Sequence, residues 1–152
     1  MAKFVFKMES ILSIKYKLED QAKAEYGLEI AKLHEEEEKL EKLKKKKLAY
    51  QTELTEAVQN HLIIFQIKKL ENSIENVKYN MNLQRIVIKQ QQLKVDEARE
   101  KLDEAVKERK TYEKLKEKAF EEFKAEIEAQ ERKEVDELVS FRFGSAKEGK
   151  DN

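Results

Sequence analysis

The sequence predicts an all-α fold: a long antiparallel two-helix coiled-coil hairpin whose second helix is longer than its first. Charged residues make up 42% of the 152 residues and apolar residues 39%, with no proline and only three glycines. Ala, Glu, Lys, Leu and Arg account for more than half of the chain, which is typical of long helices and coiled coils. Apolar residues recur about every 3.5 positions, the spacing of a left-handed coiled-coil seam.

The second half of the chain carries the clearest periodicity. From Ile67 to Phe123, alternating steps of three and four residues fall mostly on apolar side chains, and the register does not change. Glu, Lys, Gln and Ala fill most of the intervening positions and favour helices. This pattern predicts a helix over about residues 66–141.

The first half repeats the pattern less regularly. The same steps run from Met8 to Ile64, but several of the positions are charged, so register shifts are expected there. Gly27 costs about 1 kcal/mol relative to Ala in a helix interior, which softens the helix without ending it. The predicted first helix covers about residues 6–57.

A fold-back over about residues 58–65 separates the two helices, because one helix of about 130 residues would span roughly 195 Å. The registers change near Asn60, which can adopt turn geometry. Residues that lie side by side then have numbers that add to about 122. A parallel or domain-swapped dimer is the structural alternative. The hairpin forms a single domain over residues 1–143, and the polar, glycine-containing tail 144–152 is expected to be disordered.

Charge and hydropathy exclude several classes of partner. The chain has 32 basic and 32 acidic residues, balanced in each half as well, so a nucleic-acid partner is not expected. The longest apolar run, Leu62–Phe65, is too short to span a membrane, and no apolar signal core follows Met1. We expect a cytoplasmic protein without direct membrane insertion. The absence of cysteine excludes disulfides and thiolate chemistry.

No residue pattern indicates catalysis. The two histidines, His34 and His61, are far apart in the sequence. His34 precedes four glutamates, but consecutive residues point around a helix and cannot converge on one metal ion, so a solvated acidic face is the simpler interpretation. Two packed helices also offer no concave pocket that excludes water. We therefore predict no enzymatic activity, no metal and no cofactor.

Apolar residues that the seam does not use gather at two places. One group is at the fold-back, in Leu62–Phe65. The other is at the end that carries both termini: Phe4, Val5, Phe6, Phe120, Val139, Phe141 and Phe143. Exposed apolar clusters indicate contacts with partners, and local capping of the hairpin is the alternative.

Four segments, taken in order, resemble the flagellar FliJ family. They are the opening Phe4–Leu12, the stretch Lys17–Gly27, the Tyr-Gln segment Tyr50–Leu54 and the ending Glu131–Phe143. The resemblance spans about residues 4–143. The fold-back departs from the family pattern, because it lacks a glycine-containing loop between Leu54 and Ile67.

The resemblance implies a soluble, non-enzymatic stalk and adaptor of flagellar type III export, which serves motility and chemotaxis. Such a protein would lie at the inner face of the cell membrane at the flagellar base. Its implied partners are the hexameric export ATPase, whose ring assembly it promotes, the cytoplasmic domain of the export gate, and export chaperones. A stalk from another secretion system or rotary ATPase, and a generic structural tether, are the alternatives.

The resemblance also implies two binding surfaces. The residues for the export gate are Tyr50, Leu54, Ile67, Leu70 and Ile74. By analogy with the γ stalk of rotary ATPases, the residues that face the ATPase ring are Phe4, Phe6, Leu138, Val139, Phe141 and Phe143.

Overall fold

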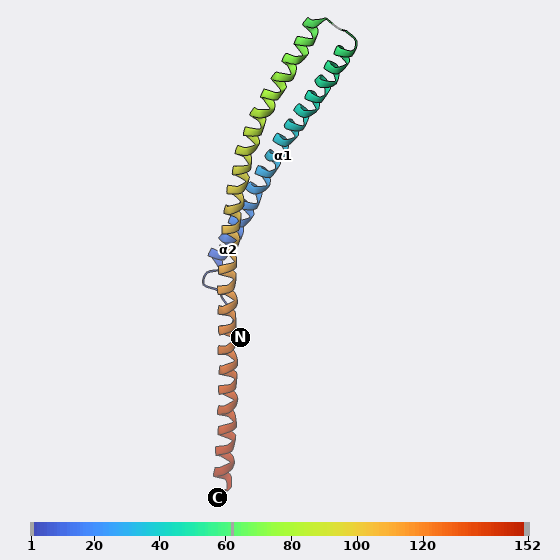
Figure 1. Cartoon of the computed structure of the whole chain (residues 1–152). Helices are drawn as coiled ribbons and strands as arrows, with labels where there is room; N and C mark the ends of the chain where they lie inside the picture. Colours follow the sequence, from blue (N-terminus) through green and yellow to red (C-terminus); the bar gives the residue numbers. More distant parts are fainter. Residues whose placement is uncertain (1, 62, 151–152) are drawn as a thin grey trace. The chain divides into compact units, whose positions relative to one another are not determined.

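Two α-helices make up the fold in the computed structural model, which describes residues 2–61 and 63–150, the last six of these by their backbone alone. Helix α1 covers Glu9–Gln59 (51 residues) and helix α2 covers Ile64–Lys150 (87 residues) (Figure 1). No strand occurs among these residues. The prediction of an all-α chain with a longer second helix is confirmed.

The chain divides into two compact units, each with a part of both helices. The fold-back unit comprises Leu18–Ala105, and the terminal unit comprises the first 17 residues together with the chain from Val106 onward. In the fold-back unit α1 and α2 run side by side in opposite directions (Figure 1).

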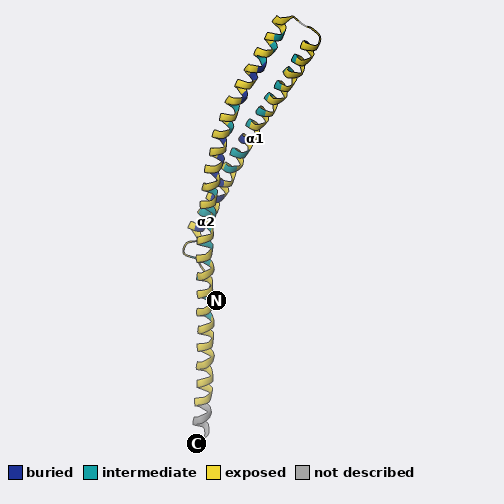
Figure 2. Cartoon of the chain, viewed as in Figure 1, coloured by how far each residue is buried: buried dark blue, intermediate teal, exposed yellow. Residues whose placement is uncertain are grey.

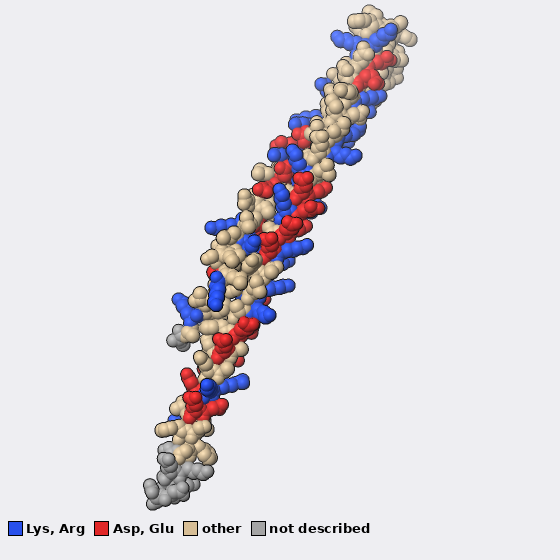
Figure 3. Space-filling model, turned by 90° about the vertical axis from the view of Figure 1, so that its left-hand side faces the viewer, with Lys and Arg blue, Asp and Glu red and all other residues tan. Residues whose placement is uncertain are grey.

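The predicted seam is the core of the fold-back unit. From Glu19 to Ala57 and from Ile67 to Ala105, every position reached by alternating steps of three and four is buried or half-buried (Figure 2). The most deeply buried of these include Ala57, Val77 and Val95. The register shifts expected in the first half do not occur. Basic and acidic side chains are interspersed over the face shown in Figure 3.

Two of the charged seam residues of α1, Glu29 and Glu36, are bound by glutamine side chains from α2. The Gln84 Nε2 donates to the backbone oxygen of Glu36 at 2.9 Å and to its Oε2 at 2.6 Å. One heptad away, the Gln91 Nε2 donates to the backbone oxygen of Glu29 at 3.0 Å and to its Oε2 at 2.5 Å. Polar layers inside a coiled coil specify its register, and these two layers explain why the charged stretch keeps the same spacing.

The reversal of the chain depends on His61. The Asn60 N–H still donates to the Glu56 backbone oxygen at 3.0 Å, so it continues the helical pattern. His61 follows with φ of 54°, the left-handed conformation that commonly ends a helix. Asn60 and His61 both lie in the turn, as the sequence predicted for Asn60, and the left-handed backbone conformation falls on His61. Leu62 lies outside the described residues.

In the terminal unit, the N-terminal residues pack on α2. The Phe4 ring meets the Phe120 ring edge-on at 5.3 Å between centroids and the Phe123 ring at 5.4 Å. The Lys15 Nζ lies 2.8 Å from a Glu108 carboxylate oxygen. That hydrogen bond is the main cause of the raised pKa of Lys15.

The α2 helix continues without a neighbour beyond this packing. Every residue from Glu128 to Gly144 is exposed. The helix runs to Lys150, past the end expected near residue 141, because Gly144 keeps a negative φ and does not break it. The expected disordered tail, 144–152, is thus helical in backbone through Lys150, and residues 151–152 lie outside the described part.

Candidate partner-binding surfaces

A groove of about 570 Å³ opens where the two helices of the fold-back unit approach the turn. It contains an aromatic ring, an aliphatic side chain, charged groups and several hydrogen-bonding groups. Its lining residues are Tyr50, Glu53, Glu56, Ala57, Asn60, Gln66, Lys69, Leu70 and Ser73. The groove therefore offers both apolar and polar contacts to a partner segment.

The five residues predicted to bind the export gate separate into two groups. Tyr50 and Leu70 line the groove and are half-buried. Leu54 and Ile67 are half-buried seam residues that do not line it, and Ile74 is 6% exposed in the core. The resemblance gives these residues by their place in the sequence, and all five are seam positions, so it does not distinguish a residue at the edge of the seam from one in its centre.

Three polar residues of the groove were not predicted from the sequence. Gln66, Lys69 and Ser73 follow one another at helical spacing along one side of α2. The Ser73 hydroxyl donates to the backbone oxygen of Lys69 at 3.0 Å. The sequence could have indicated these residues only by their helical spacing. Polar residues at that spacing are common on any exposed helix face, so the spacing does not identify a binding groove.

An exposed apolar group lies beside the groove at the start of α2. Ile63, Ile64 and Phe65 have exposed fractions between 69% and 74%. Local capping of the hairpin would have buried them, so the capping alternative does not apply to these three residues. Exposed apolar side chains of this kind mark surfaces that contact partners.

The residues predicted to face the ATPase ring also separate into two groups. Phe4 and Phe6 are half-buried, and Phe4 is already engaged with Phe120 and Phe123. The other four, on α2, have exposed fractions from 56% to 75%: Leu138, Val139, Phe141 and Phe143. Local packing therefore explains the apolar side chain of Phe4. The four α2 residues pack against no other part of the described chain.

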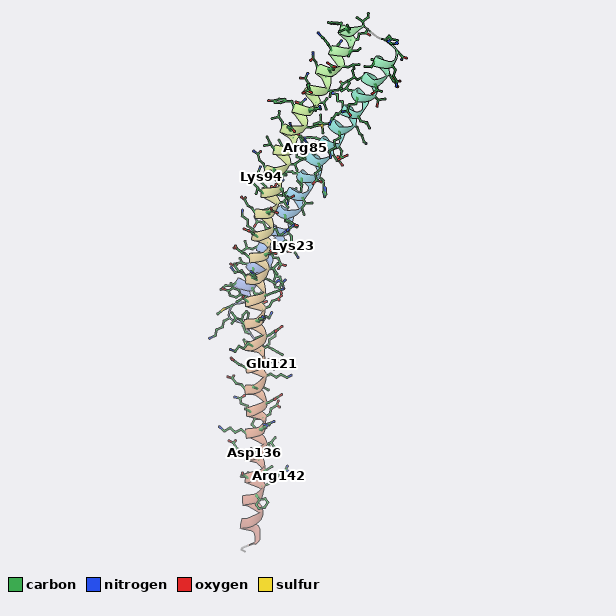
Figure 4. The ribbon with its side chains drawn as sticks, viewed as in Figure 1. Lys23, Arg85, Lys94, Glu121, Asp136 and Arg142 are labelled. Carbon is green, nitrogen blue, oxygen red and sulfur yellow. The ribbon has the colours of Figure 1, made fainter. Side chains whose placement is uncertain are left out.

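The uncovered apolar residues of α2 no longer follow the seam spacing. Continued past Phe123, the steps of three and four fall on polar residues such as Gln130 and Glu137. The apolar positions move instead to Val135, Leu138 and their neighbours, a change of register of the kind that insertions cause in coiled coils. Asp136 and Arg142 project from this stretch with no second helix beside it (Figure 4). Val135, 57% exposed, belongs to this surface and was missed in the sequence.

Metal-binding side chains do not gather at either surface within the described part of the chain. Within the described residues, no group of three or more His, Cys, Asp or Glu side chains is placed to hold a metal ion. His34 Nδ1 lies 3.5 Å from a carboxylate oxygen of Glu37, and both side chains are exposed. Over its described residues, neither helix contains a stretch apolar enough to cross a membrane.

Comparison with known proteins identifies the family. The family model described as Flagellar FliJ protein matches residues 4–148, almost the entire chain. The chain belongs to the FliJ family. As a FliJ-family member it is a structural component of flagellar protein export, which serves motility. No curated protein and no solved structure matches it.

Proposed function

We propose that this chain is a non-enzymatic stalk, adaptor and chaperone-like component of flagellar type III export. It binds the hexameric export ATPase, promotes assembly of the ATPase ring and links the ring to the cytoplasmic domain of the export gate. The observation that carries the proposal is the uncovered α2 surface at Leu138, Val139, Phe141 and Phe143 in a chain of the FliJ family.

The α2 surface supports binding to the ATPase ring. A single helix with apolar side chains at helical spacing suits insertion into a surrounding protein, where those side chains become buried. Charged residues such as Asp136, Glu137 and Arg142 lie among the apolar ones, which keeps the free protein soluble. One asymmetric stalk inside a ring alters the states of the ring subunits only by binding them unequally, so it biases assembly and nucleotide turnover without taking part in the chemistry.

The groove at the fold-back supports binding to the export gate. Tyr50 and Leu70 supply an aromatic and an aliphatic contact, and the exposed Ile63–Phe65 group extends the apolar surface beside them. Aromatic residues in partly buried positions are frequent anchors of protein interfaces. Because this surface and the α2 surface belong to different units, one chain has separate sites for the gate and the ATPase.

The location and the remaining partners follow from the same role. We place the chain in the cytoplasm, associated peripherally with the inner face of the membrane at the flagellar base through its protein partners. Export chaperones are its third class of partner.

Assembly and turnover of the export ATPase test the proposal. The wild-type chain should promote ring formation and raise ATP hydrolysis by the ATPase of the same flagellar system. The double variant Leu138→Gln/Phe141→Gln should need at least about tenfold more protein for the same effect, because a loss of about 1.4 kcal/mol of binding free energy corresponds to that factor.

The control variant is Leu28→Gln/Leu48→Gln, since both leucines are 64% exposed and lie on α1. This variant should behave as wild type. Ring assembly and ATP turnover that stay unchanged when wild-type protein is added would refute the stalk role.

A further inference from the structure

A second apolar stripe runs along α2 on the side that faces away from α1. Tyr79, Leu83, Ile86 and Leu93 have exposed fractions between 45% and 65%. With the exposed Gln90 between the last two, these positions follow one another in steps of four, three, four and three. At about 100° per residue, this set lies on the opposite side of the helix from the buried seam residues.

Within the stretch of α2 that carries most of the stripe, the only charged residues are basic. From Val77 to Val95 the chain has no acidic residue, although it has 32 acidic residues in all. The basic residues in this stretch are Lys78, Arg85, Lys89 and Lys94; Figure 4 labels Arg85 and Lys94.

The basic residues that flank the stripe most closely are available to a partner. If the stripe is treated as a coiled-coil seam, Lys89 and Lys94 occupy the positions that flank the seam. Charges at these positions determine which partner helix binds. Neither makes an ion pair with a carboxylate of the described residues. Lys94 lies in a groove that also contains Glu25, Glu29 and Glu97, and Lys78 lies 3.6 Å from a carboxylate oxygen of Glu75.

We propose that this stripe docks an amphipathic helix of another protein whose flanking residues are acidic. Apart from Val87 beside it, which is 38% exposed, the stripe has one or two apolar positions per heptad and forms a narrow seam, which fits a helix. A membrane surface would require a wider apolar face. A second copy of the chain would bring the basic flanks of both copies together, which is unfavourable. Complementary charge therefore favours an acidic helix as the occupant.

The proposed docking surface is additional to the function proposed above. Tyr79, Leu83, Ile86 and Leu93 line neither the groove at the turn nor the uncovered end of α2. Loss of this interaction should leave the effect on the export ATPase unchanged, so the two proposals fail independently.

Two designed peptides provide the test. Each is a helical peptide of about three heptads with leucine at the seam positions, long enough to form a stable helix once docked. One peptide has glutamate at the flanking positions and the other has lysine. Binding to the full-length chain is measured by fluorescence anisotropy of labelled peptide. The acidic peptide should bind at least about tenfold more tightly than the basic one.

Two variants of the protein link the binding to the stripe. Leu83→Gln/Ile86→Gln should weaken binding of the acidic peptide at least about tenfold. Leu48→Gln/Val58→Gln, which alters apolar residues of α1 with exposed fractions of 64% and 56%, should not. Lys89→Glu/Lys94→Glu should reverse the preference, so that the basic peptide binds more tightly. Because all six positions are exposed, circular dichroism should show unchanged folding.

Several results would overturn the proposal. They are equal affinity for the two peptides, no binding of either peptide, or binding that survives Leu83→Gln/Ile86→Gln. The same holds if sedimentation shows a dimer that this variant dissociates, which would make a second copy the occupant. Flotation with vesicles of anionic phospholipid that depends on the stripe, without peptide binding, would assign the surface to a membrane.

Discussion

At the scale of single residues, the polar layers of the seam do more to define the fold than any apolar side chain. An apolar seam tolerates sliding by one heptad because each leucine or valine meets a similar neighbour. Gln84 and Gln91 instead reach particular glutamates, Glu36 and Glu29, and each donates to a backbone oxygen as well as a carboxylate. A slide by one heptad would keep one glutamine opposite a glutamate and leave the other glutamine and the other glutamate without a polar partner in the seam.

The Glu36 carboxylate should make stability depend on pH. The hydrogen bond from Gln84, followed by that from Lys39, holds the pKa of Glu36 below its ordinary value of 4.5. A lowered pKa means that the stabilisation is present above pH 4.5 and is lost as the pH falls through the folded-state pKa. The free energy of unfolding of wild type should exceed that of Glu36→Gln at neutral pH, and the difference should shrink in acid.

Urea denaturation followed by circular dichroism at several pH values measures this difference. Glu35→Gln is the control, because Glu35 is an exposed neighbour outside the seam. If Glu35→Gln and Glu36→Gln change the pH profile equally, the hydrogen bond from Gln84 has no special role.

At the scale of helices, a groove and an uncovered surface arise where the two helices stop matching each other. Near the turn, the polar residues of α2 at Gln66 and Ser73 leave space beside Tyr50. In the terminal unit, α2 passes beyond the last residue that packs against the N-terminal segment and continues exposed from Glu128. The groove therefore follows from the side chains near the turn, and the uncovered surface follows from the greater length of α2. Neither surface requires a separate domain.

The groove can be tested with two tyrosines of similar environment. Tyr50 and Tyr26 are both half-buried seam residues of α1, but only Tyr50 lines the groove. Both Tyr50→Ala and Tyr26→Ala should lower the melting temperature. Only Tyr50→Ala should weaken binding to the cytoplasmic domain of the export gate, by about tenfold or more, as expected for an aromatic anchor.

Calorimetric titration of the gate domain with each variant gives the comparison. Equal loss of binding in both variants would indicate that the effect comes from the stability of the hairpin. Binding that is unchanged in Tyr50→Ala would exclude the groove as the gate-binding surface.

At the scale of the whole molecule, the sequence was most informative where a repeating pattern existed. The spacing from Ile67 to Phe123 predicted which α2 residues would be buried or half-buried, and the position of the fold-back predicted two helices of unequal length. Single events were harder to predict. The left-handed turn at His61 involves one residue that rarely adopts this conformation, and the packing of Phe4 on Phe120 joins residues far apart in sequence.

Crosslinking should show that a single chain closes on itself. The natural chain has no cysteine, so two cysteines can be introduced without interference. Lys15→Cys/Glu108→Cys places them where the structure has an ion pair of 2.8 Å. A short bismaleimide should give a product of monomer mass, 18.1 kDa for the unmodified chain.

The two single-cysteine variants are the controls, since they can form crosslinks only between chains. A product of mainly dimer mass from the double variant at low protein concentration would favour a domain-swapped or parallel dimer. Such a result would contradict the hairpin.

The exposed stretch from Glu128 to Gly144 should make partner binding measurable by amide hydrogen exchange. An isolated helical segment gains no tertiary stabilisation, so its amide hydrogens should exchange with deuterium much faster than those of the paired helices. Whatever protein encloses this segment must hold it in helical form and so slow the exchange. The residues whose amide exchange slows on binding then show where the partner contacts α2, without any substitution. The size of the slowing measures how much the partner stabilises the helical form of this segment.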